Sequence, residues 1–218
     1  MTVSDRVTRL ESAGVVAIVR LDDYSRAVEM VRSLQAGGIT AVEFTYTNPL
    51  AGAAIEETKR VFGDAMLIGA GTVLDPETAR AAMLQGADFI VTPTINVETI
   101  RSCTRYRVPS MIGAFTPTEI LTAWEAGADF VKVFPASTVG PRYLKDVRGP
   151  LPQVRLVPTG GVTLENAGEF IRAGAVGVAA GGNLVDAQVV ADGAWQVLTD
   201  RATALMDAVR NAQGEEGR

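Results

Sequence analysis

The sequence predicts an α/β fold in which a single domain, residues 1–218, forms a (β/α)8 TIM barrel with a short N-terminal helix. Eight short apolar runs, typical of buried parallel strands, alternate with amphipathic segments along almost the whole chain. The runs start roughly 20 to 26 residues apart, which leaves room for one helix in each interval. A doubly wound open sheet is the alternative. It would be expected to carry a glycine-rich turn after its first strand, where this chain has Leu21, Asp22 and Asp23.

Local signals place the elements in order along the chain. The predicted strands are Val15–Val19, Ala41–Thr45, Leu67–Gly71, Phe89–Thr92, Ser110–Gly113, Phe130–Phe134, Leu156–Thr159 and Gly177–Ala180. Helix starts are predicted where a capping side chain precedes proline, at Asn48-Pro49, Asp75-Pro76 and Thr116-Pro117, the last with a capping box to Glu119. Helix ends are predicted at Gly37, Gly63, Gly86, Gly127 and Gly174. Two further helices are expected near Asp5–Ser12 and from about Gly193 to Arg210, with a frayed tail at Gly214–Arg218.

Composition excludes several classes of function. The net charge is −5 and the basic residues are scattered, so no nucleic-acid partner is expected. No segment resembles a secretion signal or a membrane span, and the single cysteine, Cys103, fits a reducing compartment, so a cytoplasmic protein is expected. The chain has no histidine, which excludes the usual serine and cysteine nucleophile systems and removes the commonest ligand of catalytic zinc. No metal and no cofactor are expected.

A lysine in the sixth predicted strand is the main functional signal. Lys132 is flanked by apolar residues, and a buried ammonium must find a partner or lose its proton. The fifth residue after each of Gly38, Gly86, Gly127 and Gly174, at the ends of the preceding helices, gives the equivalent strand positions, which are Glu43, Val91, Lys132 and Ala179. These belong to strands two, four, six and eight, which supply one interior layer of a barrel. Glu43 and Lys132 should therefore face each other across the interior.

This charged pair has two interpretations. A buried structural ion pair is one, although such a pair is often no more stable than apolar residues of similar size. Chemistry is the other: a partly neutral lysine attacks a ketone to form an iminium, which serves as an electron sink for breaking a neighbouring C–C bond. Glu43 then fits the role of general acid/base for the carbinolamine and the substrate hydroxyl.

Residues at the ends of other strands are candidates for substrate binding. The loops after strands seven and eight are the usual phosphate site of the barrel, and here they carry Thr159, Gly160, Gly161, Gly181, Gly182 and Asn183. Thr72 offers a hydroxyl after strand three, and Arg20 after strand one is either an anion ligand or part of a salt bridge at the rim. Each glycine pair alone could be only a tight turn, but both pairs at these two strands favour anion binding. Phe134 is either a core residue or, one layer above Lys132, a wall of the site, and Pro93 is expected to shape its mouth.

Four segments, in order, resemble the bacterial KDPG/KHG aldolase family: Val42–Thr45, Gly69–Val73, Val131–Pro135 and Pro158–Gly161. Members of that family cleave 2-keto-3-deoxy-6-phosphogluconate (KDPG) and often 4-hydroxy-2-oxoglutarate (KHG). The resemblance implies a metal-independent class I aldolase that forms a homotrimer. It makes Lys132 the Schiff-base lysine and Glu43 the acid/base. It further implies that Thr72 holds the pyruvate carboxylate, Phe134 packs beside it, and the glycines after strands seven and eight bind phosphate.

The chain departs from the family pattern at two positions. Thr47 stands where some members have an arginine that helps to bind the carboxylate, and Asn183 stands where some have serine. These departures leave the preferred phosphorylated 2-keto acid open, including the galactonate epimer of KDPG. A phosphate-binding barrel isomerase and a non-catalytic sugar-phosphate binder are the competing functions, since both would share the glycine loops without needing Lys132.

Overall fold

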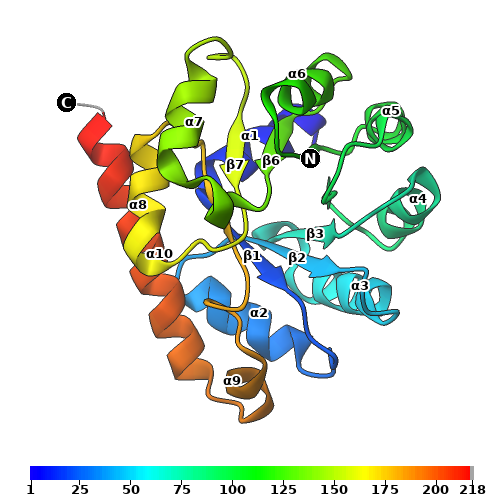
Figure 1. Cartoon of the computed structure of the whole chain (residues 1–218). Helices are drawn as coiled ribbons and strands as arrows, with labels where there is room; N and C mark the ends of the chain where they lie inside the picture. The colour runs from blue at the N-terminus through cyan, green and yellow to red at the C-terminus, as the bar shows by residue number, and fades with distance from the viewer. Residues whose placement is uncertain (217–218) are drawn as a thin grey trace.

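The computed structural model describes residues 1–216, and in it eight strands form one parallel sheet surrounded by helices (Figure 1). The strands are β1 (Val15–Val19), β2 (Ala41–Thr45), β3 (Leu67–Gly71), β4 (Phe89–Val91), β5 (Ser110–Ala114), β6 (Phe130–Val133), β7 (Leu156–Pro158) and β8 (Val178–Ala180). Strands β1 to β7 follow one another in the sheet, and β8 pairs with β1. The predicted (β/α)8 barrel is confirmed, and every strand boundary lies within one residue of its predicted position.

The ring closes between β7 and β8 through sparse pairing. An isolated parallel bridge joins Thr159 to Ala179. Below it, the Val176 amide donates a 3.1 Å hydrogen bond to the Leu156 carbonyl. The barrel is therefore nearly closed, and its seam adjoins the two loops that carry the candidate phosphate-binding glycines.

Helices fill the intervals between strands, as the alternation predicts. They are α1 (Val3–Ala13), α2 (Ala27–Ala36), α3 (Ala51–Phe62), α4 (Pro76–Leu84), α5 (Val97–Tyr106), α6 (Pro117–Glu125), α7 (Gly140–Arg148), α8 (Leu164–Arg172), α9 (Ala187–Ala191) and α10 (Trp195–Glu216), with 3-10 turns η1 (Gly63–Ala65) and η2 (Ala136–Thr138). The short helix α9 was not among the predicted elements. None of the helices within residues 1–216 is long and apolar enough to cross a membrane.

The capping predictions are confirmed at two of the three helix starts. Asp75 accepts the Thr78 amide at the start of α4, and Thr116 and Glu119 form the capping box of α6. The prediction at Asn48 is wrong, because α3 begins later, at Ala51, with no side-chain cap.

Asn48 has a different structural role. Its side-chain amide donates to the carbonyls of Leu21 and Asp22, at 3.0 and 2.9 Å, so this residue ties the loop after β1 to the loop after β2. The predicted frayed tail is also wrong for residues 214–216, which continue α10; the last two residues of that predicted tail lie outside the described residues.

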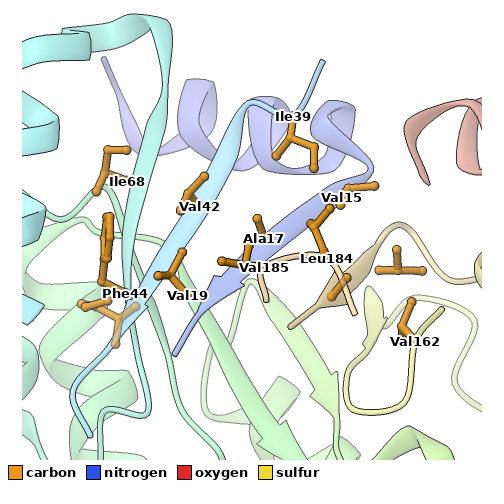
Figure 2. Close-up of a cluster of buried hydrophobic side chains, with 14 of the residues drawn as sticks. Val15, Ala17, Val19, Ile39, Val42, Phe44, Ile68, Val162, Leu184 and Val185 are labelled. Atoms are coloured by element: carbon orange, nitrogen blue, oxygen red, sulfur yellow. The ribbon is translucent and has the colours of Figure 1, made fainter. Parts of the chain in front are cut away.

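Successive side chains of each strand point to opposite faces of the sheet, and this separates two apolar cores. Figure 2 shows residues of the outer core, in which β1 contributes Val15, Ala17 and Val19. The intervening residues of the same strand, Val16 and Ile18, belong to a second cluster inside the ring of strands. Every residue of β1 is therefore buried, as expected for a parallel strand covered on both faces.

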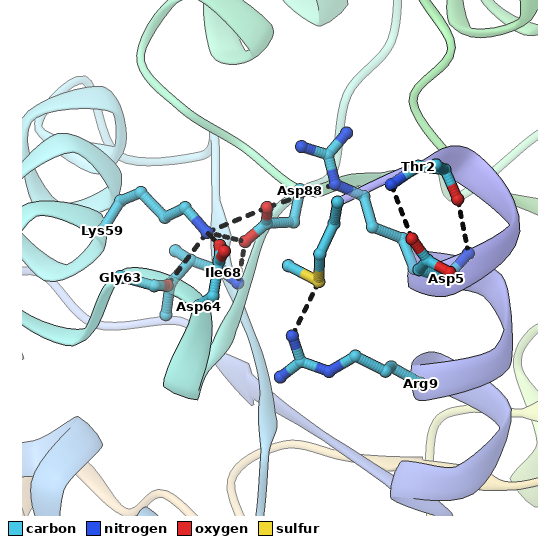
Figure 3. Close-up of polar contacts among 10 residues, drawn as sticks. Thr2, Asp5, Arg9, Lys59, Gly63, Asp64, Ile68 and Asp88 are labelled. Atoms are coloured by element: carbon cyan, nitrogen blue, oxygen red, sulfur yellow. Dashed lines mark hydrogen bonds and ion pairs between the residues drawn. The ribbon is translucent and has the colours of Figure 1, made fainter.

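Helix α1 closes the amino-terminal end of the barrel. Its residues Leu10 and Ala13 pack in the interior cluster. Near the start of β4, the buried carboxylate of Asp88 pairs with Lys59 Nζ at 2.8 Å and with Arg6 Nε of α1 at 3.4 Å (Figure 3). With this end covered, the carboxyl ends of the strands form the open face, where active sites of this fold lie.

Candidate active site

Glu43 and Lys132 point into the same layer of the barrel interior. Strand pairing leads from Glu43 across β3 to Phe89 on β4, and Val91 lies two residues further along β4. In a closed eight-stranded barrel the strands tilt, so that a layer advances about one residue per strand. The same two-residue advance leads from Val91 to Lys132 and from Lys132 to Ala179. The layer thus contains two ionisable side chains of opposite charge and two apolar side chains, in agreement with the count of five residues from the helix-ending glycines.

Burial shifts the protonation equilibrium of Lys132. The residue is 4% exposed, and desolvation lowers the pKa of its amine. The Glu43 carboxyl opposes this by raising the pKa, whereas Arg20 lowers it further. The amine lies 5.2 Å from the ring centroid of Phe134, so one side of it is apolar. A lowered pKa increases the fraction of uncharged amine at neutral pH, which is the nucleophilic form.

Burial acts on Glu43 in the opposite direction. The residue is 1% exposed, and desolvation raises the pKa of its carboxyl, while Lys132 and Arg20 lower it. Within the described chain, Oε1 of this carboxyl has no hydrogen-bond partner, and no direct ion pair joins Glu43 to Lys132. A carboxyl whose pKa lies above its ordinary value exchanges protons more readily near neutral pH, as a general acid/base must.

A pocket of about 390 Å³ opens from Lys132 toward the carboxyl ends of the strands. It brings together nine of the thirteen predicted site residues: Arg20, Lys132, Phe134, Thr159, Gly160, Gly161, Gly181, Gly182 and Asn183. Ile18 and Val162 complete its lining. The amine and the two glycine loops therefore share one cavity.

The two glycine loops line this cavity and carry backbone amides that have no acceptor among residues 1–216. Gly160 and Gly161 have φ angles of 86° and 76°, which favour glycine over residues with a Cβ. The Asn183 side chain donates 3.0 Å to the Val162 carbonyl and so links the loops after β7 and β8. Among residues 1–216, the amides of Gly160, Gly161, Gly182 and Asn183 donate no hydrogen bond to the protein. Such amides are suited to binding an anion.

Four predicted residues do not line this pocket. Glu43 is buried in the same layer as Lys132, and Thr72 and Pro93 are half-buried in the loops after β3 and β4. Thr47 lines a neighbouring pocket of about 530 Å³, which shares Arg20 with the first. The hydroxyls of Thr47 and Thr45 are 2.9 Å apart and hydrogen-bonded.

The salt bridge considered for Arg20 is not observed. This side chain is exposed, and in the part of the chain that the structure describes no ion pair joins it to a carboxylate. Arg20 lines both pockets, so its positive charge lies where an anion could bind.

Comparison with known proteins identifies the family. A family model described as KDPG and KHG aldolase matches residues 7–200. The chain is 37% identical over 199 residues to 2-dehydro-3-deoxy-6-phosphogalactonate aldolase of Escherichia coli (strain K12), covering 91% of this chain and 95% of that protein. It is 36% identical over 191 residues to 2-dehydro-3-deoxy-phosphogluconate aldolase of Treponema pallidum (strain Nichols), covering 87% and 90%.

The chain belongs to the KDPG and KHG aldolase family.

A solved member of the family bears on the chemistry. The KDPG aldolase of Legionella pneumophila, determined with pyruvate captured at low pH as a covalent carbinolamine intermediate, matches this fold with a TM-score of 0.86 and 27% identity, over 92% of this chain and 97% of that one. The chain is accordingly a class I aldolase, a carbon–carbon lyase, and the isomerase and binding-protein alternatives are set aside.

Sequence reasoning missed three contributors to the site of this aldolase. Ile18 and Val162 form its apolar lining, yet each reads as an ordinary core residue. Gly71 lies against Glu43: an added Cβ at this glycine would be 2.6 Å from Glu43 Oε1. A glycine at the end of a strand, such as Gly71, indicates that another group approaches closely. The sequence does not say which side chain occupies that space.

Proposed function

We propose that this aldolase cleaves KDPG to pyruvate and glyceraldehyde 3-phosphate, with Lys132 as the Schiff-base residue and Glu43 as the general acid/base. The observation that carries the proposal is the buried amine of Lys132 at the base of a pocket whose rim is formed by the two glycine loops. KHG, which would yield pyruvate and glyoxylate, is proposed as a second substrate of the same site.

In the first half of the reaction, the uncharged amine of Lys132 attacks the C2 carbonyl of the substrate and forms a carbinolamine. Glu43 donates a proton to the departing hydroxyl, water leaves, and a protonated iminium joins Lys132 to the substrate. The lowered pKa of the Lys132 amine supports this step, since the attacking form must be unprotonated.

In the second half, the Glu43 carboxylate removes the proton of the C4 hydroxyl. The electrons of the C3–C4 bond move into the iminium, so that glyceraldehyde 3-phosphate leaves and an enamine of pyruvate remains on Lys132. Protonation of this enamine at C3 followed by hydrolysis releases pyruvate and restores the free amine.

The remaining residues would orient the substrate. The free amides around Gly160, Gly161 and Gly182 would bind the phosphate, with Asn183 holding the two loops together. Thr72 would donate to the pyruvate carboxylate, and Phe134 would form the wall beside the iminium.

Five further residues complete the proposed binding site. Arg20 would supply the positive charge at the rim, next to Thr47. Thr159 and Gly181 would line the phosphate end of the cavity. Pro93, half-buried in the loop after β4, would border its mouth.

The galactonate epimer of KDPG is the second candidate substrate. The observation that favours it is the 37% identity to the Escherichia coli enzyme named for 2-dehydro-3-deoxy-6-phosphogalactonate. Initial rates with KDPG, its galactonate epimer and KHG, with pyruvate release as the common readout, distinguish the candidates. Preference for the galactonate epimer would replace KDPG as the assigned substrate without changing the roles of Lys132 and Glu43.

Lys132→Ala tests the Schiff base directly. The chain contains three lysines, Lys59, Lys132 and Lys145, so an adduct can be assigned to one residue by peptide mass. We expect borohydride with pyruvate to trap an adduct on Lys132 in the native protein and in the control Lys145→Ala, whose side chain is exposed. Lys132→Ala should show neither adduct nor turnover. An adduct on another lysine, or turnover by Lys132→Ala, would contradict the assignment.

We also propose that the chain is one domain, that it assembles as a homotrimer, and that it acts in the cytoplasm in the Entner–Doudoroff breakdown of sugar acids. The trimer and the metabolic role rest on the family resemblance, whereas the single domain rests on the unbroken alternation of strands and helices and the compartment on the single cysteine. Exposed apolar side chains such as Leu84, which is 70% exposed, are consistent with subunit contacts. Light scattering on the purified protein tests the trimer, and a monomeric mass at micromolar concentration would contradict it.

A further inference from the structure

We propose that Gly71 is a positioning residue for the acid/base, because the missing side chain at this position provides the space that the Glu43 carboxyl occupies. The inference rests on the role proposed above for Glu43. Gly71 ends β3, beside β2, and its strand partner is Thr45, two residues beyond Glu43. The Glu43 side chain therefore leans toward the open end of the barrel across the face of Gly71.

The distances show how tightly the two residues fit. An ideal Cβ built on Gly71 would lie 2.6 Å from Oε1, 2.8 Å from Cδ and 3.3 Å from Cγ of Glu43. All three of its nearest neighbours belong to this one side chain. The φ angle of Gly71 lies outside the left-handed region, so its backbone accepts alanine. Glu43 is thus the obstacle to a side chain at position 71.

The environment of Glu43 makes its position depend on this packing. The carboxyl is buried, and its Oε1 has no hydrogen-bond partner among residues 1–216 that would fix it in place. A methyl group at residue 71 must therefore be accommodated by moving the flexible end of Glu43. A displacement of about 1 Å in a catalytic group can cost roughly 10²-fold in rate.

Gly69 provides a matched control on the same strand and the same face. A Cβ at Gly69 would lie 2.4 Å from Cε2 and Cζ of Phe89, in the interior core, and would not meet the carboxyl. Phe89 is fully buried, so its ring has little freedom to move aside. Gly69→Ala should therefore lower stability, whereas Gly71→Ala should mainly displace the acid/base.

Steady-state kinetics, borohydride trapping and thermal unfolding of the full chain test this inference. For Gly71→Ala we expect kcat to fall by about 10- to 100-fold, with a smaller change in KM. Trapping with pyruvate should persist because Lys132 is untouched, and Tm should fall less than in Gly69→Ala. The pH limb of kcat that depends on Glu43 should also shift, because its carboxyl enters a different environment.

A second-site variant separates displacement from a general structural effect. Aspartate is one methylene shorter than glutamate, so Glu43→Asp should relieve the contact with Ala at position 71. We expect the double variant to lose less kcat than the product of the two single losses, which is the coupling shown by residues in contact. If the losses of kcat in the double variant simply multiply, the two residues act independently and the inference is overturned. It is also overturned if Gly71→Ala keeps kcat within about two-fold of the native value while Glu43→Gln is impaired. Full turnover by Glu43→Gln would instead remove the proposed function, and this inference with it.

Discussion

Burial shifts the pKa values of the two titratable residues in the interior layer in opposite directions. Desolvation lowers the pKa of the Lys132 amine and raises the pKa of the Glu43 carboxyl, so both uncharged forms gain at neutral pH. Each residue opposes the shift of the other, because a positive and a negative charge favour one another's ionised forms. The pair is therefore suited to exchanging protons with a substrate.

Glu43→Gln separates the two roles at the residue scale. Glutamine fills the same volume but does not exchange the proton, so turnover should fall by about 10²–10⁴-fold, while some borohydride trapping remains. The Glu43 carboxyl raises the pKa of the Lys132 amine, so removing the carboxyl lowers that pKa. Because trapping requires the uncharged amine, the acid limb of the trapping profile should then move to lower pH. Trapping rates measured between about pH 5 and 9, an interval that lies between the ordinary pKa values of a glutamate and a lysine, provide the test. Normal turnover, or a limb that moves to higher pH, would show that the assigned role is wrong.

At the scale of elements, the strands were predictable because each is short, apolar and bounded by turn residues, and because burial on both faces leaves a continuous apolar run. Caps were predictable where the side chain has only a local partner, as at Asp75. Asn48 was not, because its partners, the carbonyls of Leu21 and Asp22, lie on another loop. Local signals fail where a long-range hydrogen bond uses the same side chain.

The junction of α1 with the barrel depends on Asp88. This carboxylate is 1% exposed and receives hydrogen bonds from Lys59 Nζ and from the Ile68 amide, the latter at 3.1 Å, besides pairing with Arg6 (Figure 3). Asp88→Ala should lower the free energy of unfolding by about 3–5 kcal/mol, because it leaves two partly buried cations and an amide without their acceptor.

Asp64 provides the matched control for that prediction. It also approaches Lys59, at 3.4 Å, but its side chain is 71% exposed, so Asp64→Ala should change stability by less than about 0.5 kcal/mol. Denaturant unfolding of both variants gives the comparison. Because Asp88 lies at the amino ends of the strands, kcat should stay near the native value in both. Equal stabilities of the two variants would contradict the assigned role of Asp88.

At the scale of the whole molecule, the barrel itself made the site predictable. Closure and tilt bring residues 43, 91, 132 and 179 into one layer, so a count from helix-ending glycines was enough to place them together. Counting residues from these glycines could not predict how the side chains pack within the layer. The contact of Gly71 with Glu43 depends on side-chain conformation, and the sparse pairing of β7 with β8 depends on the geometry of closure. Neither leaves a periodic pattern in the sequence.

The charged layer should make the barrel less stable than an apolar layer would. Replacing two buried opposite charges by well-packed apolar side chains of similar volume is often neutral or stabilising by about 1–4 kcal/mol, whereas removing one of them costs about 3–5 kcal/mol because the other charge stays buried without its partner. We therefore expect the inactive double variant Glu43→Met/Lys132→Met, which makes the layer apolar, to equal or exceed the native protein in free energy of unfolding. Lys132→Met alone should be destabilised at pH 8. Lys145→Met, at an exposed position, should change stability by less than about 0.5 kcal/mol.

The pH dependence distinguishes a charge effect from a packing effect. Lys132 lowers the pKa of Glu43, so Lys132→Met raises it further above its value in the unfolded chain. A carboxyl with a raised folded-state pKa destabilises the fold fully above that pKa and ceases to do so as pH falls toward the unfolded value. The deficit of Lys132→Met relative to the native protein should therefore shrink between pH 8 and pH 5, whereas a packing defect would cost the same at both. Urea unfolding at the two pH values measures this difference, and a constant deficit would mean that volume, rather than charge, determines the stability of the layer.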